Sequence, residues 1–281
     1  MNNGKRWFVL TSTNVREISD FLRRNEPLST VISEKYRSGA LDRRLRRGGR
    51  FYVLSGHAAI YHGPGGFFYP IGIAPRVPYP ESLTRATGNA FKRYSIMGKT
   101  ADVVALTEWI GDSVAVQIDY LLLRRSARRP IFHSQRPDPA IRIEKPRPEE
   151  WKRLLPLQIA YEVEEVLLPG RKANPAVSKA TLTESLATQK VLVAYYNGSV
   201  IGRVATNAIG YTTAQIGGVY TDPMWRGRGV ARLLMTHLLR ELRDEGRDAS
   251  LFVKPENSAA MRLYQGLDFS FETDFRISYY S

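Results

Sequence analysis

A basic, glycine-rich turn separates a strand-like run from an amphipathic helix in the second half of this chain. Residues 226–231 read Arg-Gly-Arg-Gly-Val-Ala; residues 214–221 before them mix β-branched and small side chains, and leucines recur at helical spacing after them. A helix N-terminus offers unpaired N–H groups and partial positive charge, and glycine lets a ligand approach that backbone closely. The turn therefore predicts a pyrophosphate site; an ordinary basic surface loop is the alternative for this segment alone.

Two common phosphate-binding patterns are excluded. The dinucleotide fingerprint needs a third glycine where this chain has Arg232, and the P-loop needs a Gly-Lys-Ser/Thr sequence that is missing.

A second motif follows about thirty residues later. Residues 249–253 form a short apolar strand candidate, and Asn257 is a good N-cap for a helix that carries Tyr264. The turn matches R/Q-x-x-G-x-G/A, and the second stretch matches N-x-x-A-x-x-L-Y followed by a G-F pair. In that pair Asp268 replaces glycine before Phe269. In both motifs and in their order, the chain resembles the GNAT superfamily of acyl-CoA-dependent N-acyltransferases.

The resemblance implies an α/β (α+β) fold with a central mixed sheet, whose two central parallel strands splay apart around an acyl thioester. The splayed strands are expected at residues 215–221 and 249–253. Acetyl-CoA is the implied cosubstrate. Its implied contacts are Val219, Tyr220, Thr221, Arg226, Gly227, Arg228, Gly229, Val230, Ala231, Asn257 and Tyr264.

The resemblance also implies the chemistry. An amine attacks the thioester directly, and Tyr264 matches the position of the family's general acid for the departing thiolate. Packing of Tyr264 in the core is the alternative. The base is open, because residues 215–220 carry no carboxylate. Glu162 and Glu165, three apart on one expected helix face with Glu164 between them, are candidates. A solvated acidic helix, a water relay, or an amine that arrives deprotonated are the alternatives.

Length and composition predict two modules. A Pro-rich, charged stretch at 128–148 suggests a division into 1–137 and 138–281. The second module contains a strand at 141–144, a helix from 149 or 150, a hairpin at Asn197-Gly198 and a last strand at 275–280. The first contains expected helices at 14–24, 29–47, 81–93 and near 101–110, and strands at 50–54, 58–61, 66–71 and 114–123. It is expected to be a diverged GNAT-like module without its own acyl-CoA site.

Positive charge is concentrated in the first module. Residues 1–137 hold 22 Lys and Arg against 10 Asp and Glu, whereas residues 138–281 hold 19 against 17. The densest clusters lie at 43–50 and 124–129. They hint at an acidic or phosphate-bearing acceptor or at nucleic acid, although no nucleic-acid motif accompanies them; a solvated basic face is the alternative.

Several classes are disfavoured. The chain has no cysteine, its four histidines lack ligand spacing, and no apolar run reaches the roughly 20 residues that cross a bilayer. A cytoplasmic, metal-free protein is expected, as a monomer or a homodimer.

Two functions remain. The favoured one is an N-acetyltransferase that moves the acetyl group of acetyl-CoA to a primary amine. The alternative is a catalytically silent acyl-CoA sensor, or a nucleic-acid-associated module, on the same scaffold.

Overall fold

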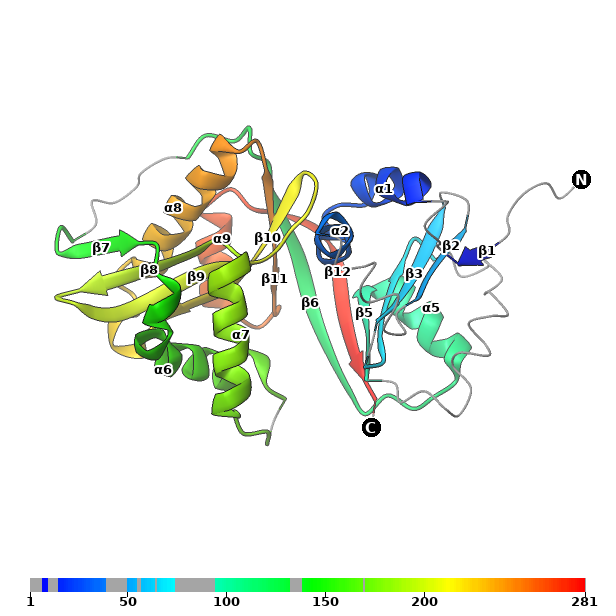
Figure 1. Cartoon of the computed structure of the whole chain (residues 1–281), viewed down its shortest axis with the longest axis horizontal. Helices are drawn as coiled ribbons and strands as arrows, with labels where there is room; N and C mark the ends of the chain where they lie inside the picture. Colours follow the sequence, from blue (N-terminus) through cyan, green and yellow to red (C-terminus); the bar gives the residue numbers. More distant parts are fainter. Residues whose placement is uncertain are drawn as a thin grey trace, which may run out of the picture.

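The computed structural model describes residues 7–9, 15–38, 50–54, 57–63, 65–73, 94–131, 138–168 and 170–280. These residues build one continuous mixed sheet with helices on both faces (Figure 1). The strand order is β1-β2-β3-β4-β5-β12-β6-β11-β10-β9-β8-β7. None of the helices in the described ranges is long and apolar enough to cross a membrane.

The second half follows the predicted order of elements. It contains β7 (Ile141–Glu144), a 3-10 turn (Pro148–Glu150), α6 (Trp151–Tyr161), a π-helical turn (Glu162–Val166), α7 (Pro175–Thr188), β8 (Val191–Tyr196), β9 (Ser199–Ile209), β10 (Thr213–Thr221), a 3-10 turn (Pro223–Trp225), α8 (Val230–Asp244), β11 (Asp248–Val253), α9 (Ser258–Gln265) and β12 (Ser270–Tyr279). The predicted hairpin joins β8 to β9, and both of its central residues, Asn197 and Gly198, have positive φ.

Strand alternation divides the core of this half between two helical layers. Leu192 and Ala194 of β8 pack in the cluster that contains α8, whereas Val191, Val193 and Tyr195 pack beneath α6 and α7. Helices therefore cover both faces of the sheet.

One helix was not predicted. The Asn174 side chain accepts hydrogen bonds from the amides of Ala176 and Val177 at the start of α7, and Pro175 occupies the first helical position. An Asn-Pro pair before a polar stretch is a recognisable helix start, but the weakly amphipathic sequence that follows gives little periodicity.

The described part of the first half follows a similar order, and residues 74–93 between β4 and β5 lie outside the described residues. It contains β1 (Trp7–Val9), α1 (Val15–Arg24), α2 (Thr30–Arg37), β2 (Arg50–Leu54), β3 (Ala58–Gly63), β4 (Phe67–Ile71), β5 (Ser95–Lys99), α5 (Thr100–Ile110) and β6 (Val116–Arg125). One face of its sheet packs against α1 and α2, and the other against α5. Of the predicted helices, 29–47 matches α2 in its first part; positions 39–49 and the predicted helix 81–93 lie outside the described residues.

The two halves exchange their last strands. β6 comes from the first half but pairs with β11, from Ala249↔Arg125 to Val253↔Leu121. β12 comes from the second half but pairs with β5, and the two exchanged strands pair with each other. They lie at the centre of the molecule in Figure 1.

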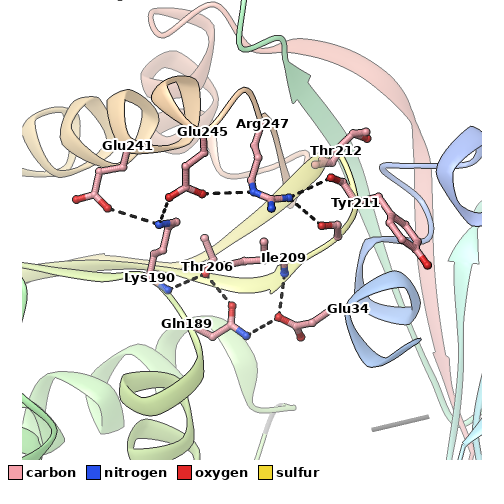
Figure 2. A network of polar contacts seen from close by, with 12 residues as sticks. Glu34, Gln189, Lys190, Thr206, Ile209, Tyr211, Thr212, Glu241, Glu245 and Arg247 are labelled. Carbon is pink, nitrogen blue, oxygen red and sulfur yellow. Dashed lines mark hydrogen bonds and ion pairs between the residues drawn. The ribbon is translucent and has the colours of Figure 1, made fainter. Parts of the chain in front are cut away.

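Polar contacts also join the halves beside α2. Glu34 of α2 accepts hydrogen bonds from the Ile209 amide at 2.9 Å and the Gln189 side chain at 2.8 Å (Figure 2). The buried Glu26 carboxylate accepts three backbone N–H bonds, at 2.8 to 2.9 Å, from the turn between β9 and β10 at residues 211–213. These contacts fix α2 against the end of β9.

Candidate active site

The parallel pair β10 and β11 separates halfway along its length. Their pairing runs from Thr213↔Asp248 to Ile216↔Leu251 and ends there, although both strands continue. On its other side β10 bulges away from β9 between Gly217 and Tyr220. Gly218 in the bulge has φ 58°, a left-handed conformation that glycine adopts readily.

A cavity of about 420 Å³ lies at this separation. From the second half it is lined by the β10 bulge, the end of β11 and α9; the predicted contacts among these are Val219, Asn257 and Tyr264. The first half and the exchanged strands also line it, through Leu28, Val31, Tyr69, Met97, Tyr120, Phe275, Ile277 and Tyr279. Both halves therefore build one site.

The glycine turn follows the end of β10. Gly227 and Gly229 have φ of 75° and 79°, and α8 begins at Val230 without a side-chain cap. The amides of the first helical turn, including that of Ala231, have no carbonyl within the helix to bond. The turn thus has the geometry of an anion site, at the open end of the separated strands.

The two arginines of the turn have different surroundings. Arg226 donates to Glu164 at 2.7 Å and to the Thr221 carbonyl at 3.2 Å, so its side chain is tied to the strand end. The Arg228 guanidinium lies over the Trp225 ring, 4.9 Å from its centre, and is exposed.

Tyr264 occupies the wall of the cavity. It lies on α9, whose N-cap Asn257 accepts a 3.0 Å hydrogen bond from the Ala260 amide. The Tyr264 ring is 7% exposed and packs against Phe269 at 5.8 Å. Burial raises the pKa of the Tyr264 phenol far above its usual value, and the nearby Tyr161 and Glu165 act in the same direction. This phenol stays protonated.

The π-helical turn directs the three candidate glutamates to three places. Glu165 lines the cavity, 3.9 Å from the Lys254 ammonium, and burial raises the pKa of its carboxyl despite that cation. Glu162 turns beneath α7 and accepts hydrogen bonds from Ser178 and from Gln158, the latter at 2.6 Å. Glu162 and Glu165 therefore do not share a helix face, although their spacing predicted that they would.

Glu164 faces the glycine turn. Its carboxylate accepts from Arg226 and, at 2.9 Å, from the Tyr220 phenol, and the bond from Arg226 holds the pKa of Glu164 below its usual value. Tyr220 and Thr221 lie on the path from the cavity to the turn and do not line the cavity itself.

Tyr161 is a site residue that the sequence did not reveal. Its hydroxyl lies 3.3 Å from the Gly218 amide of the bulge, which donates to it, and burial raises the pKa of its phenol. The buried Arg203, held by Gln158, has its charge 5.7 Å from the centre of the Tyr161 ring. Tyr161 directly precedes the acidic segment 162–165, and this position is the sequence feature that could have pointed to it.

Much of the described basic cluster is structural. Arg125 is 4% exposed and donates to the Leu267, Arg129 and Pro130 carbonyls, and Arg124 pairs with Asp248 at 2.7 Å. The cluster at 43–50 lies outside the described residues, apart from the backbone of Arg50. Among the described residues no group of three or more potential metal ligands is present.

Comparison with known families identifies the second half. The acetyltransferase (GNAT) family profile matches residues 159–269, which span the separated strands, the glycine turn and α9. The segment is a GNAT domain. Within this GNAT domain Asp268 has φ 62°, so it adopts the conformation that the family's usual glycine favours; aspartate is among the few residues that tolerate it.

Known proteins resemble the chain in sequence and fold. A 64-residue stretch is 44% identical to mycothiol acetyltransferase of Nocardiopsis dassonvillei, spanning 21% of this chain and 19% of that protein. A Drosophila protein structure covers 99% of both chains with TM-score 0.69 at 12% identity. A tandem GNAT protein from the clavulanic acid biosynthesis pathway covers 97% of both, with TM-score 0.62 at 11% identity. The last two share the fold of the whole chain, over both of its halves.

Proposed function

We propose that the protein transfers the acetyl group of acetyl-CoA directly to the nitrogen of a primary amine. The observation that carries this function is one cavity where β10 and β11 separate, with the buried Tyr264 phenol on its wall and a helix N-terminus at its open end. The two groups that such a reaction needs, a proton donor and a pyrophosphate cradle, flank the same opening.

The cosubstrate would extend from the glycine turn into the cavity. The amides of 226–231 bind the pyrophosphate, and the partial positive charge of the α8 N-terminus favours it. The backbone of Val219 and Thr221 and the Asn257 side chain hold the pantetheine arm. The thioester then lies at the β10 bulge, where its carbonyl oxygen would replace the Tyr161 hydroxyl as the acceptor of the Gly218 N–H.

The transfer moves three protons. Glu165 takes a proton from the substrate ammonium, and the free amine attacks the thioester carbon. The carbon–sulfur bond then breaks, and the departing sulfur receives a proton from Tyr264. The attacking nitrogen still carries one proton more than an amide holds, and the loss of this proton through solvent restores the Tyr264 phenol. The products are an N-acetyl amide and free CoA thiol, and the proton on Glu165 returns to solvent.

The raised pKa of Tyr264 is compatible with its role. Burial keeps the phenol neutral until charge develops on sulfur. A thiolate in the same apolar cavity is also desolvated, which raises the pKa of its thiol in the same direction. Burial therefore raises the proton affinities of the Tyr264 phenolate and of the departing CoA thiolate together.

Calorimetric titration with acetyl-CoA tests the binding site. We expect one site per chain, and we expect Arg228→Glu to weaken binding tenfold or more, about 1.4 kcal/mol, because it places negative charge beside the pyrophosphate. Arg128→Glu is the matched control, since Arg128 is exposed and follows β6 near the start of β11, at the opposite end of the strands from the turn.

Equal weakening by both charge reversals would indicate a general effect of net charge and contradict the assigned turn. Absence of acetyl-CoA binding would contradict the function as a whole.

A further inference from the structure

Beyond the expected position of the thioester, the cavity is lined by side chains of a different kind from those on the cosubstrate side. Its eight residues, from the loop before α2, from α2, β4 and β5, and from the exchanged strands, are all aliphatic or aromatic: Leu28, Val31, Tyr69, Met97, Tyr120, Phe275, Ile277 and Tyr279. Among the described lining residues of the whole cavity, the charged side chains are Glu165 and Lys254, and these two lie 3.9 Å apart. Each of these two charges is therefore partly balanced by the other.

Aromatic side chains of the exchanged strands form one wall of this space. Tyr120 and Phe275 both pack against Phe252, with ring centres 6.4 Å and 4.1 Å away, and Tyr279 lines the same wall. Burial, followed by the proximity of Tyr279, Tyr161 and Glu165, raises the pKa of Tyr120 to about 12. An added anion would meet the same unfavourable surroundings, whereas a cation is attracted by ring faces and by Glu165.

We propose that the acceptor is a small primary amine on an apolar, preferably aromatic body, bound as an ammonium ion between this aromatic wall and Glu165. This assignment rests on the proposed function and narrows its substrate. It opposes the acidic or phosphate-bearing acceptor that the positive charge of the first half suggested. Of the basic residues described at 124–129, Arg124 and Arg125 are held in structural contacts, and none of the four lines the cavity.

Cavity size limits the acceptor further. About 420 Å³ lies near the lower end of the 300–1,000 Å³ typical of small-molecule sites, and the acetyl-bearing end of the cosubstrate shares it. A single ring with a short aminoalkyl chain suits the remaining space.

The test compares three amines on the intact protein: 2-phenylethylamine, hexylamine and O-phosphoethanolamine. Turnover is measured by release of CoA thiol. Binding is measured separately, by calorimetric titration of each amine into protein saturated with CoA. We expect kcat/KM for 2-phenylethylamine to exceed that for O-phosphoethanolamine at least 100-fold, with hexylamine between them.

Substitution of Met97 tests the wall itself. Met97→Lys places a cation beside the bound ammonium, and we expect it to lower kcat/KM for 2-phenylethylamine at least tenfold with an unchanged acetyl-CoA Kd. Met97→Leu, which preserves the apolar surface, should stay within about threefold of the native protein. An unchanged acetyl-CoA Kd shows that the variant is folded.

Failures of the acceptor class and of the function are distinguishable. Preference for O-phosphoethanolamine, no binding of either apolar amine to the CoA complex, or equal effects of Met97→Lys and Met97→Leu would overturn the acceptor class. Binding of 2-phenylethylamine without CoA release would support the acceptor class and overturn the transfer reaction.

Discussion

The Tyr264 hydroxyl is the single group whose removal best separates catalysis from binding. Tyr264→Phe keeps the ring that packs against Phe269 and removes only the proton donor. We expect kcat to fall about 100-fold, within the range typical of a general acid, and the acetyl-CoA Kd to stay within about threefold. Thiol release and calorimetry measure the two quantities.

Tyr195→Phe is the matched control, because it removes a hydroxyl from another buried tyrosine, beneath α6 and α7. Equal kcat in the native protein and Tyr264→Phe would assign Tyr264 to packing. Binding of acetyl-CoA without turnover of any amine would instead favour the silent acyl-CoA sensor.

The Glu165 carboxyl predicts a pH dependence. A base acts when deprotonated, and burial raises the pKa of Glu165 above the ordinary value of 4.5, so kcat/KM should rise with pH through a midpoint above 4.5. Glu165→Gln should lower kcat near neutral pH about 100-fold and regain activity in alkaline solution, where the amine is already deprotonated.

A pH–rate profile of Glu165→Gln beside exposed Glu184→Gln checks this role. If both variants keep the native profile, a water relay or a deprotonated acceptor replaces Glu165.

For single residues, contiguous motifs located cavity-lining positions better than the helical spacing of the glutamates did. Asn257 and Tyr264 were predicted from a short contiguous pattern, and both line the cavity. Spacing grouped Glu162 with Glu165, but the π-helical turn separates them. The rotation per residue about the helix axis is smaller in a π turn than in an α-helix, and no residue type predicts where such a turn occurs.

Among the elements, the β10 bulge sets the shape of the opening. A Cβ at Gly218 would lie 2.6 Å from Arg203 Nη2, and that guanidinium is buried and held by Gln158. We expect Gly218→Ala to lower the free energy of unfolding by about 1–3 kcal/mol for the left-handed backbone, and further because Arg203 must move.

Gly111→Ala is the comparison, because Gly111 has φ 76° at the end of α5 with open space around it. Urea unfolding curves measure both variants. Equal losses would show that Arg203 moves without cost.

Elements bounded by clear turn or capping residues were predictable from the sequence. The hairpin at Asn197-Gly198 and the start of α8 after Gly229 agree with the structure, because glycine and asparagine there satisfy positive φ. By contrast α7 was missed, since its start is marked but its interior is not strongly amphipathic. The side chains that line the proposed acceptor space come from elements far apart in sequence, so no local pattern could predict that they lie together.

Across the whole molecule, the exchanged strands make the halves interdependent. Without the first half, β11 and β12 would lose β6 between them and expose two long sheet edges. We predict that a fragment of residues 138–281 alone is insoluble or unfolds without cooperativity. Coexpression with residues 1–137 should yield a soluble one-to-one complex, checked by size-exclusion chromatography and thermal unfolding.

A soluble 138–281 fragment with a cooperative transition would contradict this dependence. The exchange itself was beyond sequence reasoning: the first half was expected to resemble the second, but the partner of a final strand depends on pairing across the entire chain.

Strand exchange also has a consequence for biosynthesis. The sheet of the first half is completed by β12, which leaves the ribosome after every other strand. At roughly 5–20 residues per second, β6 would wait on the order of ten seconds or more for β12. During that interval β5 and β6 present unpaired edges in the nascent chain. Slow translation or an early stop in the last few dozen codons would therefore harm the first half as much as the second.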